Sequence, residues 1–476
     1  MRKTKIVATI GPATHSAEMI RQLIAAGVDV IRLNFSHGRA ADHAVALSHV
    51  RRAAAAAGRV VAILQDLQGP KIRTGMLAQN VPVMLMEGQD LVITTAACSG
   101  SAQRVSTTYA ALPQDVHPGD RILLSDGLIA LEVLDSSATE VKTRVLNGGL
   151  LKEYQGINLP GVALSAPALT EKDRTDLSFG LEHGVDYITL SFVRQASDIA
   201  EVKALMQAQG VQIPVVAKIE RAEALQDLPA ILDLADAIMV ARGDLGVEMP
   251  PEEVPVIQKQ LIEAANEAAL PVITATQMLE SMIQQPRPTR AEVSDVANAI
   301  IDGSDAIMLS AETAIGAHPL AAVEMMVRIA KIAETSGRHG AMDKPRRWAI
   351  TPPRSPAQAI AAAARTYTEQ QRVAAICVFT LSGETARLVA HQRPRVPILA
   401  FTPSQETLRK MALFWGVIPM LTHFTPDAAA LWQHVKPAVR RLLQETSGQV
   451  LLIGGHPFGT GATTNLIKIQ NLDGDD

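Results

Sequence analysis

The chain has 476 residues, 47% of them hydrophobic and 19% charged, so it is long enough for two or three domains around a large core. A net charge of −4 provides no overall basic field, so we expect neither a nucleic-acid partner nor a membrane partner. The two cysteines, Cys98 and Cys377, lie far apart without metal-ligand spacing, and the chain has no apolar run long enough for a bilayer and no signal peptide, so we expect a cytoplasmic protein.

A short phrase recurs along the chain, in which a small residue and an Asp precede an apolar run that ends in a polar residue. A glycine that ends a helix just before a fully apolar strand is typical of a helix leading into a buried parallel strand. Helical patterns at residues 41–57, 199–209 and 257–269 support this alternation. The copies of the phrase and four further apolar runs predict eight strands, in residues 5–10, 26–34, 60–66, 183–191, 215–219, 234–240, 272–276 and 303–310.

One stretch, residues 69–167, loses the helical period and shows short alternating runs separated by turn signals, which predicts an inserted β domain. The remainder, residues 1–68 and 168–345, has about the 250 residues of a (βα)₈ TIM barrel. We therefore predict an α/β fold with such a barrel as the catalytic domain. An open doubly wound sheet is the alternative, but no glycine-rich fingerprint follows the first strand.

A Pro- and Arg-rich stretch, residues 344–356, marks the next boundary. After it a helix at 357–367, a strand at 373–380 and a helix at 384–392 predict a C-terminal α/β domain in residues 346–476.

Polar and charged residues gather where the predicted barrel strands end. The C-terminal ends of barrel strands are where TIM barrels carry their chemistry, and a purely structural barrel needs few charges there. These residues are Arg32, Asn34, Ser36, Asp66, Lys71, Arg73, Ser191, Arg194, Lys218, Glu220, Arg242, Asp244, Thr276, Ser310 and Glu312.

Glu220 and Asp244 follow neighbouring strands, so both carboxylates can reach one hard cation such as Mg²⁺. A surface carboxylate pair is the alternative, and Lys218 could simply form a salt bridge with either acid. Backbone N–H groups at Gly243 and Asp244 suit an anion. The Thr276 hydroxyl could relay a proton or merely cap a helix. The chain has no GxxxxGK[ST] phosphate loop, so a bound nucleotide would depend on a metal and scattered cations.

Several motifs together resemble the pyruvate kinase family. They are IRLNFSHG (31–38), GPKIRTG (69–75), AKIE (217–220), VARGDLGVE (240–248), ATQMLESM (275–282), PRPTRAEVSDVANA (286–299) and IMLSAET (307–313). The resemblance starts at TKIVATIGPAT (4–14) and covers nearly the whole chain. It implies a TIM barrel with a small β-barrel lid inserted after the third strand and a C-terminal α/β regulatory domain. It also implies a homotetramer.

The resemblance implies phosphoryl transfer from phosphoenolpyruvate to ADP, giving ATP and pyruvate, with Mg²⁺ or Mn²⁺ as cofactor. Its implied catalytic residues are Lys218, Thr276 and Arg32. By position, Glu220 and Asp244 hold the metal. The backbone of Gly243 and Asp244, with Thr276, binds the substrate carboxylate, while Arg32 and Lys218 neutralise the phosphoryl group. The implied nucleotide residues are Asn34, His37 and Arg73, with Pro12 near the adenine.

One departure from the family pattern concerns potassium. Family members that need a monovalent cation usually have Thr and Glu where this chain has Leu67 and Lys71. The change from Glu to Lys alters the local charge by two units, so we predict that the Lys71 ammonium replaces K⁺. The residues of this monovalent-cation site or its substitute are Asn34, Ser36, Asp66, Leu67 and Lys71.

A second departure concerns regulation. Thr380, Ser382, Gly383 and Thr385 follow a strand and open a helix, which is a layout for binding an anion. Leu381 and Glu384 weaken the case for a sugar bisphosphate there, which leaves a monophosphate sugar or nucleotide effector, or an ordinary helix cap. The glycine-rich turn at 454–461 is either part of an effector loop or a plain hairpin.

Two rival functions remain open on the residues alone. The first is a metal-dependent lyase acting on a pyruvate enolate, which would not need the set of Arg32, Lys71, Arg73 and Lys218. The second is a silent sugar-phosphate sensor, which the retention of Lys218, Glu220, Asp244 and Thr276 disfavours.

Overall fold

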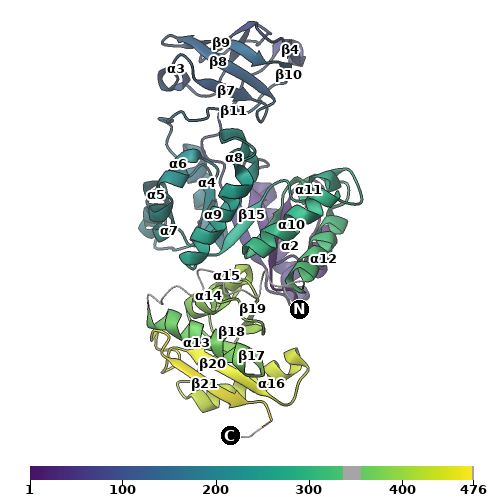
Figure 1. The fold of residues 1–476 in the computed structure, drawn as a ribbon, viewed down its shortest axis with the longest axis vertical. Helices are drawn as coiled ribbons and strands as arrows, with labels where there is room; N and C mark the ends of the chain where they lie inside the picture. Colours follow the sequence, from purple (N-terminus) through teal and green to yellow (C-terminus); the bar gives the residue numbers. More distant parts are fainter. Residues whose placement is uncertain (336–354, 474–476) are drawn as a thin grey trace.

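The computed structural model describes residues 1–335 and 355–473 as three stacked parts. A barrel lies in the middle, an inserted β region lies beyond one of its ends, and a C-terminal α/β domain lies beyond the other (Figure 1). Within the described residues no helix is both long enough and apolar enough to span a membrane.

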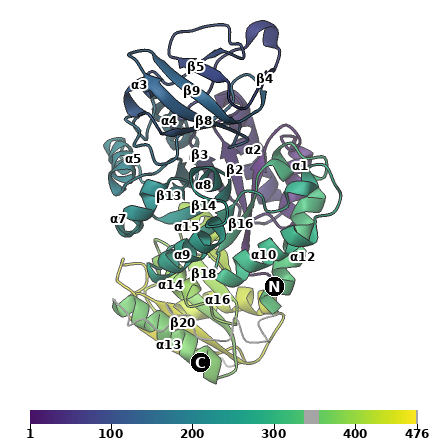
Figure 2. The same cartoon turned by 45° about the horizontal axis from the view of Figure 1, so that its top comes forward.

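Eight parallel strands within residues 1–335 close into the predicted barrel, in the order β1-β2-β3-β12-β13-β14-β15-β16. Figure 2 looks partly into it, with β2, β3, β13 and β14 near the centre of the picture. The predicted strands are confirmed to within a few residues. They are β1 (Lys5–Ile10), β2 (Val30–Asn34), β3 (Ala62–Asp66), β12 (Tyr187–Leu190), β13 (Val215–Ile219), β14 (Ala237–Ala241), β15 (Val272–Ala275) and β16 (Ala306–Leu309).

Helices connect the strands and cover the outside of the barrel. A capping box begins α10 (Arg290–Asp302), because the Thr289 hydroxyl accepts from the Glu292 N–H at 3.2 Å and the Glu292 carboxylate accepts from the Thr289 N–H at 2.7 Å. The helices are α1 (Ala17–Ala26), α2 (Ala40–Ala56), α4 (Glu171–His183), α5 (Ala196–Ala208), α6 (Ala222–Gln226), α7 (Leu228–Leu234), α8 (Arg242–Glu248), α9 (Val254–Glu267), η2 (Glu280–Ile283), α10 (Arg290–Asp302), α11 (Ala311–Ala314) and α12 (Pro319–Thr335).

The apolar strands are buried on both faces, which explains their continuous hydrophobic runs. Along β14, Ile238 and Val240 pack outward in the core between barrel and helices, whereas Ala237 and Met239 belong to the core inside the barrel. The same alternation holds along the other strands, so every second residue points into the barrel.

The inserted β region follows β3 and consists of a six-stranded and a two-stranded sheet in the described chain. Its core is made of alternating residues such as Ile129, Leu131 and Val133. The strands are β4 (Val83–Leu85), β5 (Asp90–Thr94), β6 (Arg104–Ser106), β7 (Arg121–Leu124), β8 (Ile129–Ser136), β9 (Glu140–Asn147), β10 (Gly149–Leu151) and β11 (Ile157–Asn158), with η1 (Ala78–Asn80) and α3 (Leu112–Asp115).

The C-terminal domain is a sheet in the order β19-β18-β17-β20-β21, flanked by helices. The predicted helices and the strand at its start are confirmed, whereas residues 344–354 of the predicted Pro- and Arg-rich stretch lie outside the described residues. The elements are α13 (Pro356–Gln370), β17 (Val373–Phe379), α14 (Glu384–His391), β18 (Ile398–Thr402), α15 (Gln405–Lys410), η5 (Met411–Leu413), β19 (Val417–Leu421), α16 (Ala428–Leu443), β20 (Gln449–Gly454) and β21 (Leu466–Asn471).

The C-terminal domain docks on the N-terminal ends of the barrel strands through buried polar contacts. Asp186, just before β12, accepts from Arg409 of α15 at 2.7 Å. Asp305, just before β16, pairs with Arg393 at 2.9 Å. The Lys5 ammonium of β1 donates to the carbonyl of Val417 at 2.7 Å. Chemistry at the opposite end of the barrel is therefore separated from this interface by the length of the strands.

We expect Lys5 to give the protein a measurable pH dependence of stability. Burial, opposed by Asp29, lowers the pKa of its ammonium to about 8, with further contributions from Arg2, Arg59 and Glu334. The unfolded chain therefore binds more protons than the native one between pH 8 and 10.5, so stability rises with pH in that window. Lys5→Met should remove about 2 kcal/mol of the rise in unfolding free energy between pH 7 and pH 9.5.

Urea unfolding followed by the fluorescence of Trp415, which packs beneath Lys3 and Arg393 in the same interface, measures this effect. Lys142→Met, which removes an exposed lysine from the inserted region, is the control and should keep the full rise. An equal pH dependence in wild type and Lys5→Met would contradict the prediction.

Candidate active site

Strand alternation brings the polar residues of several strands together inside the C-terminal end of the barrel. Thr9 pairs in register with Arg32, and Asn34 with Asp66, across β1, β2 and β3. Lys218 lies two residues after Val216 on β13, so its side chain also points into the barrel. The structure therefore brings polar residues from distant segments of the chain together at this end of the barrel.

Arg32 and Asp66 form a buried ion pair. The guanidinium Nε and Nη2 donate to Asp66 Oδ2 at 2.7 and 2.6 Å, and Nη1 donates to Thr9 Oγ1 at 3.1 Å. Burial alone would raise the pKa of Asp66, but the charges of Arg32 and Lys218 outweigh it and lower the value. Most N–H groups of the Arg32 guanidinium thus donate to other residues of the protein, and these contacts hold the side chain in place.

Lys218 lies among carboxylates. Its Nζ is 2.5 Å from Glu220 Oε1, so the predicted alternative of a salt bridge with Glu220 exists in this structure. Burial works to lower the pKa of Lys218, but Glu220, Asp66 and Asp244 together raise it above its usual range. Lys218 therefore keeps its positive charge at neutral pH.

Glu220 and Asp244 lie close enough for the charge of Asp244 to act on the Glu220 carboxyl group. Glu220 is fully buried, and its Oε2 accepts from the backbone N–H of Phe192 at 2.9 Å. Burial, together with the Asp244 charge, raises the pKa of Glu220 despite the opposing Lys218. The single ammonium of Lys218 therefore undercompensates these two carboxylates, and a hard divalent cation, for which carboxylate oxygens are preferred ligands, fits the donor set.

Thr276 sits directly after β15 in an unusual backbone conformation, with φ of 68°. Its hydroxyl accepts from the Gly243 N–H at 2.8 Å and donates to the carbonyl of Ala275 at 2.6 Å. A Cβ added to Gly243 would lie 3.5 Å from the Thr276 hydroxyl oxygen. The glycine thus keeps open the space between the start of α8 and Thr276.

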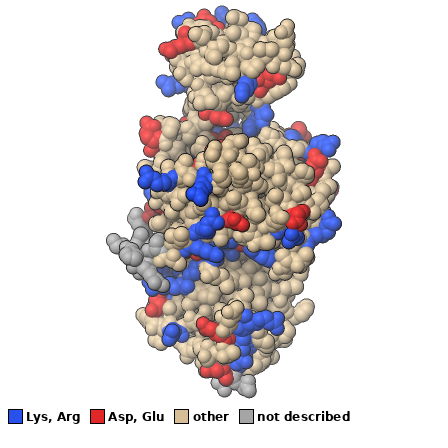
Figure 3. Space-filling model, turned by 90° about the vertical axis from the view of Figure 1, so that its right-hand side faces the viewer, with Lys and Arg blue, Asp and Glu red and all other residues tan. Residues whose placement is uncertain are grey.

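Three basic groups line the approach to this cluster. Lys71 lines the cleft between the barrel and the inserted region. Desolvation lowers the pKa of the Lys71 ammonium, while Asp244 and Glu220 oppose the shift and Arg73 and Lys218 add to it. Desolvation also lowers the pKa of His37, followed by the charges of Lys71, Arg73 and Arg32. Figure 3 shows the narrowing of the molecule between the barrel and the inserted region.

A cavity of about 670 Å³ lies beside β1 and β2, at the start of α1 and α2. It is lined by Pro12, Asn34 and His37, the residues that the resemblance assigns to the nucleotide side, and by His15 and His49. Its size and mostly apolar wall suit a heterocyclic base.

The residues assigned to the monovalent-cation site are not equivalent in the structure. Asn34 accepts from the Ser36 N–H at 3.1 Å, and Asp66 lies in the ion pair with Arg32. Leu67 is 1% exposed and packs in the core between barrel and helices. Among them, Lys71 is the group whose charge faces Asp244 and Glu220.

Some strand-end residues turn out to be structural. Glu312 is fully buried and accepts from the backbone N–H groups of Leu279 at 3.0 Å and Ser310 at 2.7 Å. Arg194 donates to the carbonyl of Leu164 at 2.6 Å. Hydrogen bonds to the backbone therefore account for the positions of these two strand-end side chains.

Asp126 lines the cleft beside Asp244, although the sequence indicated only a turn at Ser125-Asp126-Gly127. These three residues all have positive φ, at 53°, 56° and 86°, so the hairpin between β7 and β8 is strained at its tip. The turn signal was visible in the sequence, but its position opposite α8 depends on tertiary structure.

The predicted effector loop is internally hydrogen-bonded. The Gly383 N–H donates to Thr380 Oγ1 at 2.9 Å, and the Glu384 N–H donates to Ser382 Oγ at 3.3 Å. The hydroxyls of Thr385 and Thr464 are 2.7 Å apart, so the loop contacts the connection between β20 and β21. That connection joins antiparallel strands, as in the hairpin alternative.

Residues 1–323 match the family described as pyruvate kinase, barrel domain, and residues 358–470 match pyruvate kinase, alpha/beta domain. The chain belongs to the pyruvate kinase family. The enzyme is accordingly a phosphotransferase.

Individual pyruvate kinases are similar to this chain over nearly all of its length. The pyruvate kinase of Geobacillus stearothermophilus is 46% identical over 98% of this chain and 80% of its own. That of Mycobacterium intracellulare is 45% identical over 100% of this chain and 99% of its own. The crystal structure of a pyruvate kinase from Cryptosporidium parvum superposes with a TM-score of 0.90 at 37% identity, covering 99% of this chain and 96% of the other.

Proposed function

We propose that the enzyme transfers the phosphoryl group of phosphoenolpyruvate to ADP, giving ATP and pyruvate. The observation that carries the proposal is the cluster of Lys218, Glu220 and Asp244 beside the Arg32–Asp66 pair, at the C-terminal end of the barrel. Phosphoryl transfer requires fixed positive charge around the migrating group more than it requires a reactive side chain.

In this proposal Lys218 and Arg32 stabilise the charge of the migrating phosphoryl group. Both lie in one low-exposure cluster, where a charge acts more strongly than in water. Because its pKa is raised, Lys218 serves as a persistent cation facing the enolate oxygen, not as an acid.

Glu220 and Asp244 would hold Mg²⁺ or Mn²⁺, and the cation when bound would neutralise charge on substrate oxygens. Their contact and the raised pKa of Glu220 support this assignment.

Gly243, Asp244 and Thr276 would orient the substrate carboxylate. The Gly243 N–H donates to Thr276 in this structure, so the carboxylate would share or take over that donor. Thr276 would then lie on the proton path to the methylene carbon, with its hydroxyl oriented by the carbonyl of Ala275. The adenine of ADP would occupy the cavity beside Pro12 and His37, with Asn34 and Arg73 on its phosphate side.

We also propose that the enzyme does not require K⁺, because the Lys71 charge faces the same carboxylates. The family resemblance supports a homotetramer working in the cytoplasm, with residues 69–167 as a lid domain and residues 346–476 as a regulatory domain. A sugar-phosphate or nucleotide effector would bind at Thr380, Ser382, Gly383 and Thr385. Light scattering measures the assembly, and activity across a panel of phosphorylated sugars and nucleotides tests the effector.

Turnover of phosphoenolpyruvate with ADP and MgCl₂ tests the function. We expect ATP and pyruvate to form in equal amounts, measured separately by luciferase light and by lactate dehydrogenase-coupled NADH oxidation. Pyruvate with inorganic phosphate but no ATP would mean that phosphoenolpyruvate is hydrolysed rather than used to phosphorylate ADP, and would contradict the proposal. Neither product, with phosphoenolpyruvate or sugar phosphates still bound, would support the sensor.

A further inference from the structure

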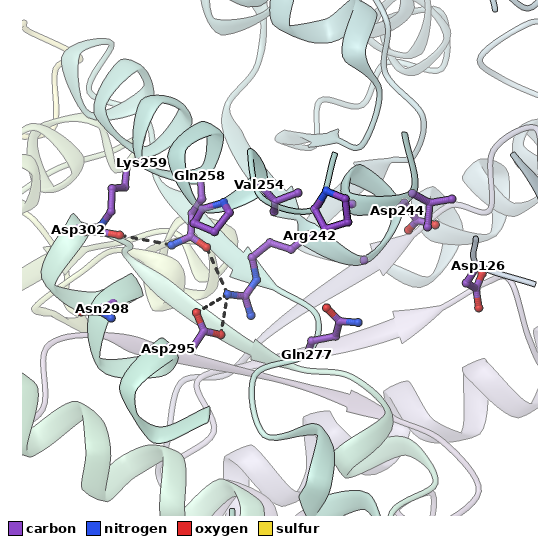
Figure 4. Close-up of a pocket in the computed structure, with 15 residues that line it drawn as sticks. Asp126, Arg242, Asp244, Val254, Gln258, Lys259, Gln277, Asp295, Asn298 and Asp302 are labelled. Carbon is purple, nitrogen blue, oxygen red and sulfur yellow. Dashed lines mark hydrogen bonds and ion pairs between the residues drawn. The ribbon is translucent and has the colours of Figure 1, made fainter. Parts of the chain in front are cut away.

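Arg242 lies at the start of α8, and its guanidinium points away from Asp244 (Figure 4). Its guanidinium reaches the two carbonyls at the end of β15, with Nη2 2.5 Å from Thr276 O and Nε 3.3 Å from Ala275 O. On its other side Nη1 lies 2.7 Å from both oxygens of Asp295 on α10, and 3.3 Å from Gln258 Oε1 on α9 (Figure 4). Arg242 is 9% exposed, so these bonds form largely away from water.

These contacts coincide with a strained turn. Thr276 and Gln277 have φ of 68° and 53°, in the left-handed region that is costly for a β-branched residue such as threonine. Successive carbonyls of an extended strand point in opposite directions, whereas both Ala275 O and Thr276 O here face one guanidinium. The left-handed turn is the conformation that presents both carbonyls to Arg242, so Arg242 compensates its strain.

The turn fixes the Thr276 hydroxyl. With the backbone left-handed, Thr276 Oγ1 lies 2.8 Å from the Gly243 nitrogen, and Gly243 follows Arg242 directly in the chain. One side chain thus ties the end of β15 to the start of α8 from behind, and the hydroxyl joins the same two segments on the active-site side.

We propose that Arg242 is a positioning residue, which holds the left-handed turn and thereby places the Thr276 hydroxyl for the proton step, while Asp295 orients its guanidinium. This rests on the proposed function. Arginine suits the task because its planar fork can bind two carbonyls and a carboxylate at once, which a lysine ammonium on a flexible stem does less well.

Steady-state kinetics test the role. Arg242→Met should lower kcat at least about tenfold and leave KM for ADP within twofold, because the nucleotide cavity lies against β1 and β2. Arg242→Lys should recover only part of the loss. Asp295→Asn should act in the same direction but more weakly, because Asp295 is 37% exposed at the edge of the cavity in Figure 4.

A second readout separates positioning from general destabilisation. Exchange of the pyruvate methyl protons in D₂O, followed by NMR with Mg²⁺ and ATP, reports the proton step without net turnover. Thr276→Val and Arg242→Met should each slow the exchange, and the double variant should be no slower than the worse single variant by more than twofold. Gln277→Gly in the Arg242→Met background should restore part of kcat, because glycine adopts positive φ without strain.

Arg51 provides a matched control at the other end of the barrel. Its guanidinium also binds two carbonyls, of Val61 and Gly184, and an aspartate, Asp186. Arg51→Met should therefore cost stability but leave the exchange rate within twofold. The positioning role would be overturned if the effects of Arg242→Met and Thr276→Val on the exchange rate were fully additive, or if Arg242→Met kept the wild-type kcat. In either case, ATP formation by the wild type would still uphold the proposed function. Absence of ATP formation by the wild type would overturn the proposed function itself.

Discussion

Replacing Lys218 by Met is expected to lower kcat by at least about 10³-fold. Loss of one preorganised donor at a developing charge costs about 10²–10³-fold in an enzyme active site, and Lys218 contributes a full positive charge in a buried position. Its raised pKa means that the charge is present throughout the neutral range, so a change of pH should not compensate for the loss. Steady-state kinetics with saturating phosphoenolpyruvate, ADP and MgCl₂ measure the effect.

A metal-binding measurement shows whether Lys218 acts on charge or merely supports the fold. Without the ammonium the two carboxylates keep their mutual repulsion, so Lys218→Met should bind Mn²⁺ at least as tightly as wild type, as measured by electron paramagnetic resonance. Glu220→Gln should weaken Mn²⁺ binding at least tenfold. Lys203→Met, which removes a partly exposed lysine paired with Asp236, is the control and should change neither value. A Lys218→Met variant within tenfold of wild-type kcat would refute the proposed role.

The barrel could be predicted because its strands carry a strong local signal. Each is apolar over most of its length, as burial on both faces requires, and most follow a helix that ends in glycine or another small residue. Period-two alternation then indicates which side chains point inward, so the meeting of Arg32, Asp66 and Lys218 could be anticipated from strand ends alone.

The partners within the site could not be predicted in the same way. The Arg32–Asp66 pair depends on the register of β2 against β3, and the approach of Asp126 to Asp244 depends on where the inserted region folds back. The left-handed turn at Thr276 is held by an arginine 34 positions earlier in the chain. These are long-range contacts, which have no counterpart in local sequence pattern. For the same reason Glu312 was grouped with the functional charges, although it binds backbone N–H groups.

Lys71→Glu is expected to make the enzyme dependent on potassium. The substitution changes the charge by two units at a position that faces Asp244 and Glu220. A unit charge about 4 Å from a phosphate contributes about 4 kcal/mol at an effective dielectric of 20, and solvent around the exposed Lys71 lowers this to roughly half. In tetramethylammonium buffer kcat should therefore fall at least about 30-fold, and KCl at equal ionic strength should restore most of it.

Two substitutions at Lys71 distinguish the loss of its positive charge from the gain of oxygen ligands for K⁺. Lys71→Met removes the ammonium without adding a carboxylate, so it should lose activity and recover less with KCl than Lys71→Glu, which supplies oxygen ligands for the ion. Lys152→Met, an exposed lysine of the inserted region, should behave as wild type in both buffers. If wild type itself lost activity by orders of magnitude without K⁺ and regained it with KCl, the ammonium would not replace the ion. Of the two residues that depart from the family pattern, Leu67 is buried and has no polar group to bind a cation. Only Lys71 can therefore supply the positive charge that replaces K⁺.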